Sequence, residues 1–128
     1  PLLDRMDIRI DVHTPSRVDM VATNLLDSAS IRERVVEARA RARRRLDGTP
    51  WSLNAQLPGA WLRHHSGIDT SLIAQLDRLV DSGNSSMRGV DRMLRLSWTL
   101  ADLDGAPRPT FEHIVAAQQL RNGADQYE

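Results

Sequence analysis

At 128 residues and 41% hydrophobic content the chain can bury a core, which must be mainly aliphatic because only one Phe, one Tyr and three Trp are present. Its 17 basic residues balance 17 acidic ones, which excludes a strong overall attraction to nucleic acid, and the absence of cysteine excludes disulfides and thiolate zinc sites. All 17 basic residues are arginine, and without lysine the chain cannot form an ATP-binding P-loop.

The first part of the chain predicts a single strand followed by a connector. Met6–His13 alternates apolar and polar residues, which is typical of a half-buried β-strand, and Pro15 ends the pattern. A lone strand is not stable, so we expect its partners in sequence that precedes Pro1. The start at Pro1, without an initiator Met, agrees with a fragment of a longer protein.

The remainder predicts a bundle of about five helices joined by short loops. Ser30 and Glu33 form a capping box that starts the longest helix, and Gly48 ends it. The later helices are predicted to begin at Pro58, at Asp69 or Thr70, at Ser85 or Ser86, and at Thr110.

Apolar residues at steps of three and four give the predicted helices a buried face. On the longest helix this face comprises Ile31, Val35, Ala38, Ala42 and Leu46. On the helix that begins near Ser86 it comprises Met87, Val90, Met93, Leu94, Trp98, Ala101 and Leu103.

Five of the arginines cluster in Arg39–Arg45. We consider Arg43, Arg44 and Arg45 as candidates for contact with DNA or a neighbouring subunit. The alternative is a solvated helix face, because these arginines alternate with alanines that face inward. No aromatic residue lies within the cluster, so base stacking there is unsupported.

The adjacent His64 and His65, with Asp69 nearby, do not predict a metal site. Neighbouring side chains on a helix diverge by about 100°, so the two imidazoles are poorly placed to bind one ion. We interpret His113, near the start of the last helix, as a packing residue.

Four segments, in the same order and with similar spacing, resemble magnesium-chelatase-like AAA+ ATPases of the ComM/YifB type. The family's motifs are PLLDR-x-D, NAQ, S-x-R-x-x-x-R followed by T-I-A-D-L, and EH. The matching segments of this chain are Pro1–Ile8, Asn54–Leu57, Ser86–Leu103 and Glu112–Ala117.

The resemblance implies a mainly α fold, in which one remnant β-strand of the AAA+ core precedes a helical bundle that forms the C-terminal lid. Residues 1–27 would be the end of the core, 28–123 the lid, and 124–128 a frayed tail. The full-length parent would use ATP with Mg²⁺.

The resemblance also implies roles for individual arginines. Arg5 would be the arginine finger that reaches the ATP of the neighbouring subunit, and Arg88 the sensor-2 arginine on the subunit's own ATP. The alternatives are surface arginines, Arg5 paired with Asp4 or Asp7 and Arg88 with Asp91. Arg92 would be a structural residue or contact a subunit or DNA.

The resemblance thus implies a parent ATPase that forms a homo-oligomeric ring and remodels DNA, while the fragment alone would not hydrolyse ATP. One alternative is the lid of a true magnesium-chelatase ATPase subunit. Another is a non-enzymatic helical module that binds DNA or a partner protein. No apolar stretch is long enough for a membrane span, so we expect no membrane partner and a cytoplasmic location.

Overall fold

A computed structural model of the chain describes residues 2–22 and 26–123. Every regular element in these two ranges is helical. The α-helices are α1 (Arg17–Val21), α2 (Ser28–Arg45), α3 (Gly59–His64), α4 (Thr70–Asp81), α5 (Met87–Asp104) and α6 (Phe111–Asn122), and the 3-10 turns are η1 (Leu3–Arg5) and η2 (Asn54–Gln56).

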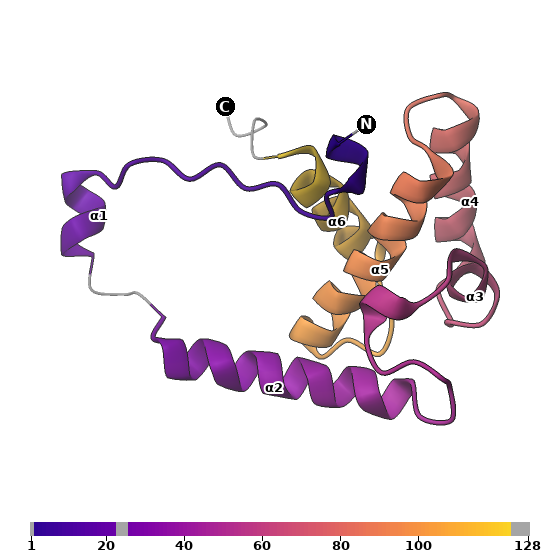
Figure 1. Cartoon of the computed structure of the whole chain (residues 1–128), viewed down its shortest axis with the longest axis horizontal. Helices are drawn as coiled ribbons and strands as arrows, with labels where there is room; N and C mark the ends of the chain where they lie inside the picture. The colour runs from indigo at the N-terminus through magenta and orange to yellow at the C-terminus, as the bar shows by residue number, and fades with distance from the viewer. Residues whose placement is uncertain (1, 23–25, 124–128) are drawn as a thin grey trace.

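Helix α5 is the centre of the bundle, because it packs against α2, α3, α4, α6 and η2. In Figure 1, α2 crosses one end of α5, and the α4–α5 loop lies at the other end. Helix α1 lies apart from the bundle in the same view. The predicted helical bundle is therefore confirmed, with α5 as its axis.

The buried face predicted for α5 is largely confirmed. Val90, Leu94 and Ala101 are fully buried, and Met93 and Trp98 are nearly so, whereas Met87 at the start of the helix is 51% exposed. Fully buried leucines from the surrounding elements complete the core: Leu46, Leu57 and Leu62. The core is aliphatic around one tryptophan, as the composition requires.

Helix α2 begins earlier than predicted, and its cap is Asp27 instead of Ser30. The Asp27 side chain accepts a hydrogen bond from the Ser30 backbone N–H at 2.7 Å. This bond favours the charged carboxylate and lowers the pKa of Asp27. Because the N-terminal half of α2 extends past the end of α5 in Figure 1, Ile31 and Val35 are exposed, and the buried face starts at Ala38.

The prediction of a strand at Met6–His13 is wrong, since no strand is present in the parts of the chain that the structure describes. The segment is extended, but no neighbouring strand offers it a ladder of hydrogen bonds. One backbone bond attaches it to the bundle, from the Arg9 N–H to the Leu120 carbonyl at 2.8 Å. The apolar residues of the pattern, such as Ile10 and Val12, are exposed.

The other predicted helix starts agree with the structure. Asp69, Ser86 and Thr110 are the N-caps of α4, α5 and α6, and Pro58 directly precedes α3. The predicted tail at 124–128 lies outside the described residues. Among the described helices, none is both long and apolar enough to cross a bilayer.

Candidate functional site

The N-terminal end of α5 carries Arg88, the predicted sensor-2 residue. Ser86 caps this helix by accepting a hydrogen bond from the Gly89 N–H at 3.0 Å. Arg88 lies in the first turn and is exposed, and no hydrogen bond or ion pair engages its guanidinium within 2–22 and 26–123. A helix N-terminus and an exposed guanidinium both favour an anion, so this end of α5 is suited to phosphate.

Arg5, the predicted arginine finger, lies close to this helix end. It is the last residue of η1, and its exposed side chain has no partner in the described part of the chain. The residue before it, Asp4, accepts a hydrogen bond from the Ser86 hydroxyl at 3.2 Å and lies 3.7 Å from the Arg121 guanidinium. The segments that carry Arg5 and Arg88 are therefore in contact.

The other two arginines of α5 have intramolecular partners. Arg92 forms an ion pair with Asp7, and its side chain is only 20% exposed. The Arg95 guanidinium donates a hydrogen bond to the Leu57 carbonyl at 2.7 Å. Both residues thus hold other segments against α5, whereas Arg88 does not. The predicted contact of Arg92 with DNA or a subunit stays a prediction.

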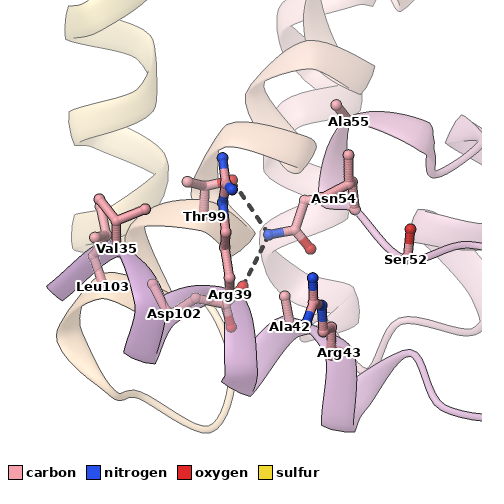
Figure 2. Close-up of a pocket in the computed structure, with 12 residues that line it drawn as sticks. Val35, Arg39, Ala42, Arg43, Ser52, Asn54, Ala55, Thr99, Asp102 and Leu103 are labelled. Carbon is pink, nitrogen blue, oxygen red and sulfur yellow. Dashed lines mark hydrogen bonds between the residues drawn. The ribbon is translucent and has the colours of Figure 1, made fainter. Parts of the chain in front are cut away.

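The C-terminal end of α5 holds a buried polar cluster that sequence reasoning did not find. The Arg45 guanidinium pairs with the Asp102 carboxylate, donates to the Asn54 side-chain oxygen at 2.5 Å, and stacks 3.8 Å from the centre of the Trp98 ring. Figure 2 shows the Asn54 amide between α2 and α5, where it donates to Asp102 at 2.8 Å and to Thr99 at 3.2 Å.

This cluster joins two of the segments that resemble the family's motifs. Asn54 belongs to the NAQ segment, and Thr99 and Asp102 belong to the segment that resembles T-I-A-D-L. The cluster joins them across more than 40 residues, with Asn54 and Asp102 48 positions apart. The sequence signal that could have predicted this cluster is Asp102, a carboxylate one turn after Trp98 on the predicted buried face of the helix.

The arginine cluster of α2 is divided between two environments. Arg41 donates to the Asp102 carbonyl at 2.6 Å, and Arg45 is held in the buried cluster, so both turn toward α5. Arg43 and Arg44 are exposed. The predicted patch is thus not one continuous basic face, although contact of Arg43, Arg44 and Arg45 with DNA or a subunit stays a prediction.

A pocket of about 330 Å³ opens beside the buried cluster, between α2 and the η2 loop (Figure 2). Its wall is mostly apolar, and Arg39 and Arg43 of α2 lie among its lining residues. Its lining residues include two hydroxyl side chains, Ser52 and Thr99, and one carboxylate, Asp102, which pairs with Arg45.

The histidines are placed away from any ligand cluster. His64 and His65 are exposed, with ring centres 6.5 Å apart and planes at 71°. His113 is buried and links helix ends, because its Nδ1 accepts from the Thr110 N–H at 3.0 Å and its Nε2 contacts Asp104 at 2.8 Å. In the described residues, no three His, Asp or Glu side chains are grouped to hold a metal ion.

Comparison with known protein families identifies the chain. The family described as magnesium chelatase, subunit ChlI C-terminal, matches residues 26–121. The chain belongs to this family. The match covers α2 to the end of α6 and so includes both ends of α5.

Individual relatives agree with this family. An uncharacterized protein of Mycobacterium tuberculosis is 35% identical over 121 residues, which cover 94% of this chain and 24% of the relative. The uncharacterized protein YifB of Escherichia coli is 27% identical over 123 residues with the same coverages. The chain therefore spans about a quarter of the length of these relatives. No solved structure matches it.

Proposed function

We propose that this magnesium-chelatase-like C-terminal domain supplies two arginines to ATP in an AAA+ ring, Arg5 as the arginine finger and Arg88 as the sensor-2 residue. The observation that carries the proposal is their common setting. Both guanidiniums are exposed and unpaired within the described ranges, and the contact between Asp4 and Ser86 joins their segments.

An unpaired guanidinium suits the phosphates of ATP because it stays charged and presents a planar fork of donors. Arg5 would stabilise the charge that develops as the γ-phosphate leaves, and Arg88 would contact the phosphates from the lid. The P-loop must come from outside this chain, which has no lysine. Its arginines fit the phosphates, and the metal-binding residues for Mg²⁺ would likewise lie elsewhere in the parent.

The contact between the two segments favours a different assignment of Arg5 and Arg88 to the ATP sites of the ring. The family resemblance implies that Arg5 contacts the neighbour's ATP and Arg88 the subunit's own ATP. Because Asp4 contacts Ser86, the two segments lie side by side at one end of α5. We therefore favour a single phosphate group that both arginines of one subunit approach.

The decisive experiment replaces Arg5 in the full-length protein and measures steady-state ATP turnover. Arg5→Ala should lower turnover by about 10³- to 10⁵-fold, because the negatively charged γ-phosphate loses the guanidinium that stabilises it as it leaves. ATP binding, followed with a fluorescent nucleotide, should be retained. The matched control is Arg78→Ala, on the exposed side of α4. Unchanged turnover in the Arg5 variant would show that Arg5 is not the arginine finger.

Rings mixed from the two single variants, Arg5→Ala and Arg88→Ala, test the shared site. If the two arginines come from different subunits, some junctions in a mixed ring contain both, and part of the turnover returns. If both come from one subunit, no junction is intact and turnover stays absent. We expect no recovery of turnover. Partial recovery would mean that Arg5 contacts the neighbour's ATP and Arg88 the subunit's own ATP.

We further propose, as the family resemblance implies, that the parent ring remodels DNA. Arg43 and Arg44 of α2 are exposed and could contact DNA phosphates. Replacing both with alanine should weaken salt-dependent DNA binding by the full-length protein. An equal DNA affinity would favour the alternatives, a metal-inserting chelatase subunit or a module that binds a partner protein.

A further inference from the structure

The segment 3–9, here called the N-terminal strap, crosses the bundle at the α5 end that carries Arg88. Asp4 contacts Ser86 and Arg121, and Asp7 forms an ion pair with Arg92. Carboxylates of the strap thus meet hydroxyl and guanidinium groups of α5 and α6 on both sides of Arg5.

The other end of the strap is attached to the C-terminus of α6. The Arg9 N–H donates to the Leu120 carbonyl at 2.8 Å, and its guanidinium donates to the Asn122 carbonyl at 2.6 Å. Arg121 completes the attachment by donating to the Met6 carbonyl at 3.1 Å. The last carbonyls of a helix lack intrahelical partners and carry partial negative charge, so a cation is favoured there.

These contacts have a direct consequence for Arg5. Asp4 and Asp7, its two nearest acidic neighbours in sequence, were the alternative partners that would have neutralised it. Both carboxylates instead face the bundle, Asp4 toward Arg121 and Asp7 toward Arg92. Both carboxylates therefore pair with arginines of the bundle, which leaves the Arg5 guanidinium available for an external anion.

Gly89 permits this arrangement at the start of α5. A Cβ at this position would lie 2.8 Å from the Ser85 hydroxyl, 3.3 Å from the Ser86 hydroxyl and 3.4 Å from the Arg121 guanidinium. The absence of a side chain thus leaves room for the Ser85 hydroxyl beside the first turn of α5, whereas Arg121 would be in ordinary van der Waals contact with such a Cβ.

We propose that Arg92, together with Arg121, is a positioning residue for Arg5. The pair Arg92–Asp7 holds the strap on the lid helix and keeps Asp7 away from Arg5, so that Arg5 and Arg88 move as one unit with α5. This inference rests on the proposed role of Arg5 and adds the lid helix as the element that orients it.

The test is a charge exchange in the full-length protein. Arg92→Asp places two carboxylates opposite each other, which should release the strap and lower ATP turnover by about three- to tenfold, as for a partly exposed ion pair whose sign is reversed. Asp7→Arg should have a similar effect. The double variant Asp7→Arg/Arg92→Asp restores opposite charges and should recover most of the turnover.

Two further measurements separate positioning from folding and from the finger role itself. The melting temperature of Arg92→Asp should stay close to that of the Arg78→Asp control. In an Arg5→Ala background, Arg92→Asp should cause no further loss, because it acts through Arg5.

The outcomes are distinguishable. If Arg5→Ala abolishes turnover while Arg92→Asp leaves it unchanged, or if the charge exchange fails to restore it, the positioning role is wrong and the finger role stands. If Arg5→Ala leaves turnover unchanged, the proposed function fails first.

Discussion

At the C-terminal end of α5 the Arg45 guanidinium contacts Asp102, Asn54 and the Trp98 ring, whereas at the N-terminal end Arg5 and Arg88 are exposed with no partner in the described residues. Arginines from different elements thus have two different settings at the two ends of α5. A guanidinium whose donors are already used stabilises the fold, and one whose donors are free can bind a phosphate. A missing partner alone does not single out Arg5 and Arg88, because Arg78 is also exposed and unpaired within the described residues; their place at the N-terminal end of α5 distinguishes them.

A second contrast concerns apolar surface. The bundle from Ala38 onward buries its aliphatic residues, while segments before it expose large ones, including Ile10, Val12, Val18 and Met20. Exposed apolar side chains over such a length are characteristic of an interface. We expect the remainder of a full-length protein to cover them.

The largest stability effect should follow removal of Asp102, which is 2% exposed. Asp102→Ala leaves the partly buried Arg45 charge without its carboxylate and removes one of the two acceptors of the Asn54 amide, so the free energy of unfolding should fall by about 3 kcal/mol. Urea denaturation followed by circular dichroism measures this. The exposed Asp47→Ala is the control, and an equal midpoint for both variants would mean that the cluster does not stabilise the fold.

Replacing Trp98 should have a smaller effect at the same end of α5. Trp98→Phe removes part of a buried ring and its close contact with the Arg45 guanidinium, at a cost of about 1–2 kcal/mol. In an Arg45→Ala background the same substitution should cost less, because the cation is gone. Equal losses in both backgrounds, measured in urea, would argue against a cation–π contribution.

Gly105 ends α5 with a φ of +71°, in the left-handed region where a Cβ is unfavourable. Gly105→Ala should lower the free energy of unfolding by about 1 kcal/mol. Gly105→Asn should lose less, since Asn tolerates this conformation better. Thermal unfolding of the two variants gives the comparison, and a more stable alanine variant would contradict the conformational argument.

The smallest expected effect is a pH dependence at the start of α2. The hydrogen bond from Ser30 lowers the pKa of Asp27, so its contribution is complete above the unfolded pKa of about 3.9 and is lost as the pH falls through the lower folded value. Amide resonances of Ser30 should therefore shift below about pH 4. The shift should disappear in Asp27→Asn, and its persistence there would assign it to another group.

What the sequence predicted well depended on neighbouring residues. The caps Asp69, Ser86 and Thr110 lie immediately before their helices, so local pattern was sufficient. At α2 the local pattern indicated Ser30 as the cap, whereas the chain uses Asp27, three residues earlier. The strand prediction was wrong because a strand needs a neighbouring strand to pair with, which a local sequence pattern cannot show.

The candidate site shows the same limit. The roles of Arg5 and Arg88 could be proposed only from the family resemblance, because the sequence alone favours surface arginines that pair with Asp4, Asp7 or Asp91. The partners of Arg45 and Arg92 lie 57 and 85 positions away, and such distant pairs follow from tertiary packing alone.

The contrast between the ends of α5 is tested most directly by ATP turnover in the full-length protein carrying Arg88→Ala, with Arg78→Ala as the reference. We expect turnover to fall well below the reference while the melting temperature stays the same, because the Arg88 side chain is exposed and has no hydrogen bond or ion pair within the described residues. Turnover equal to the reference, or a loss that follows a lowered melting temperature, would contradict the assignment of this end of α5 to ATP.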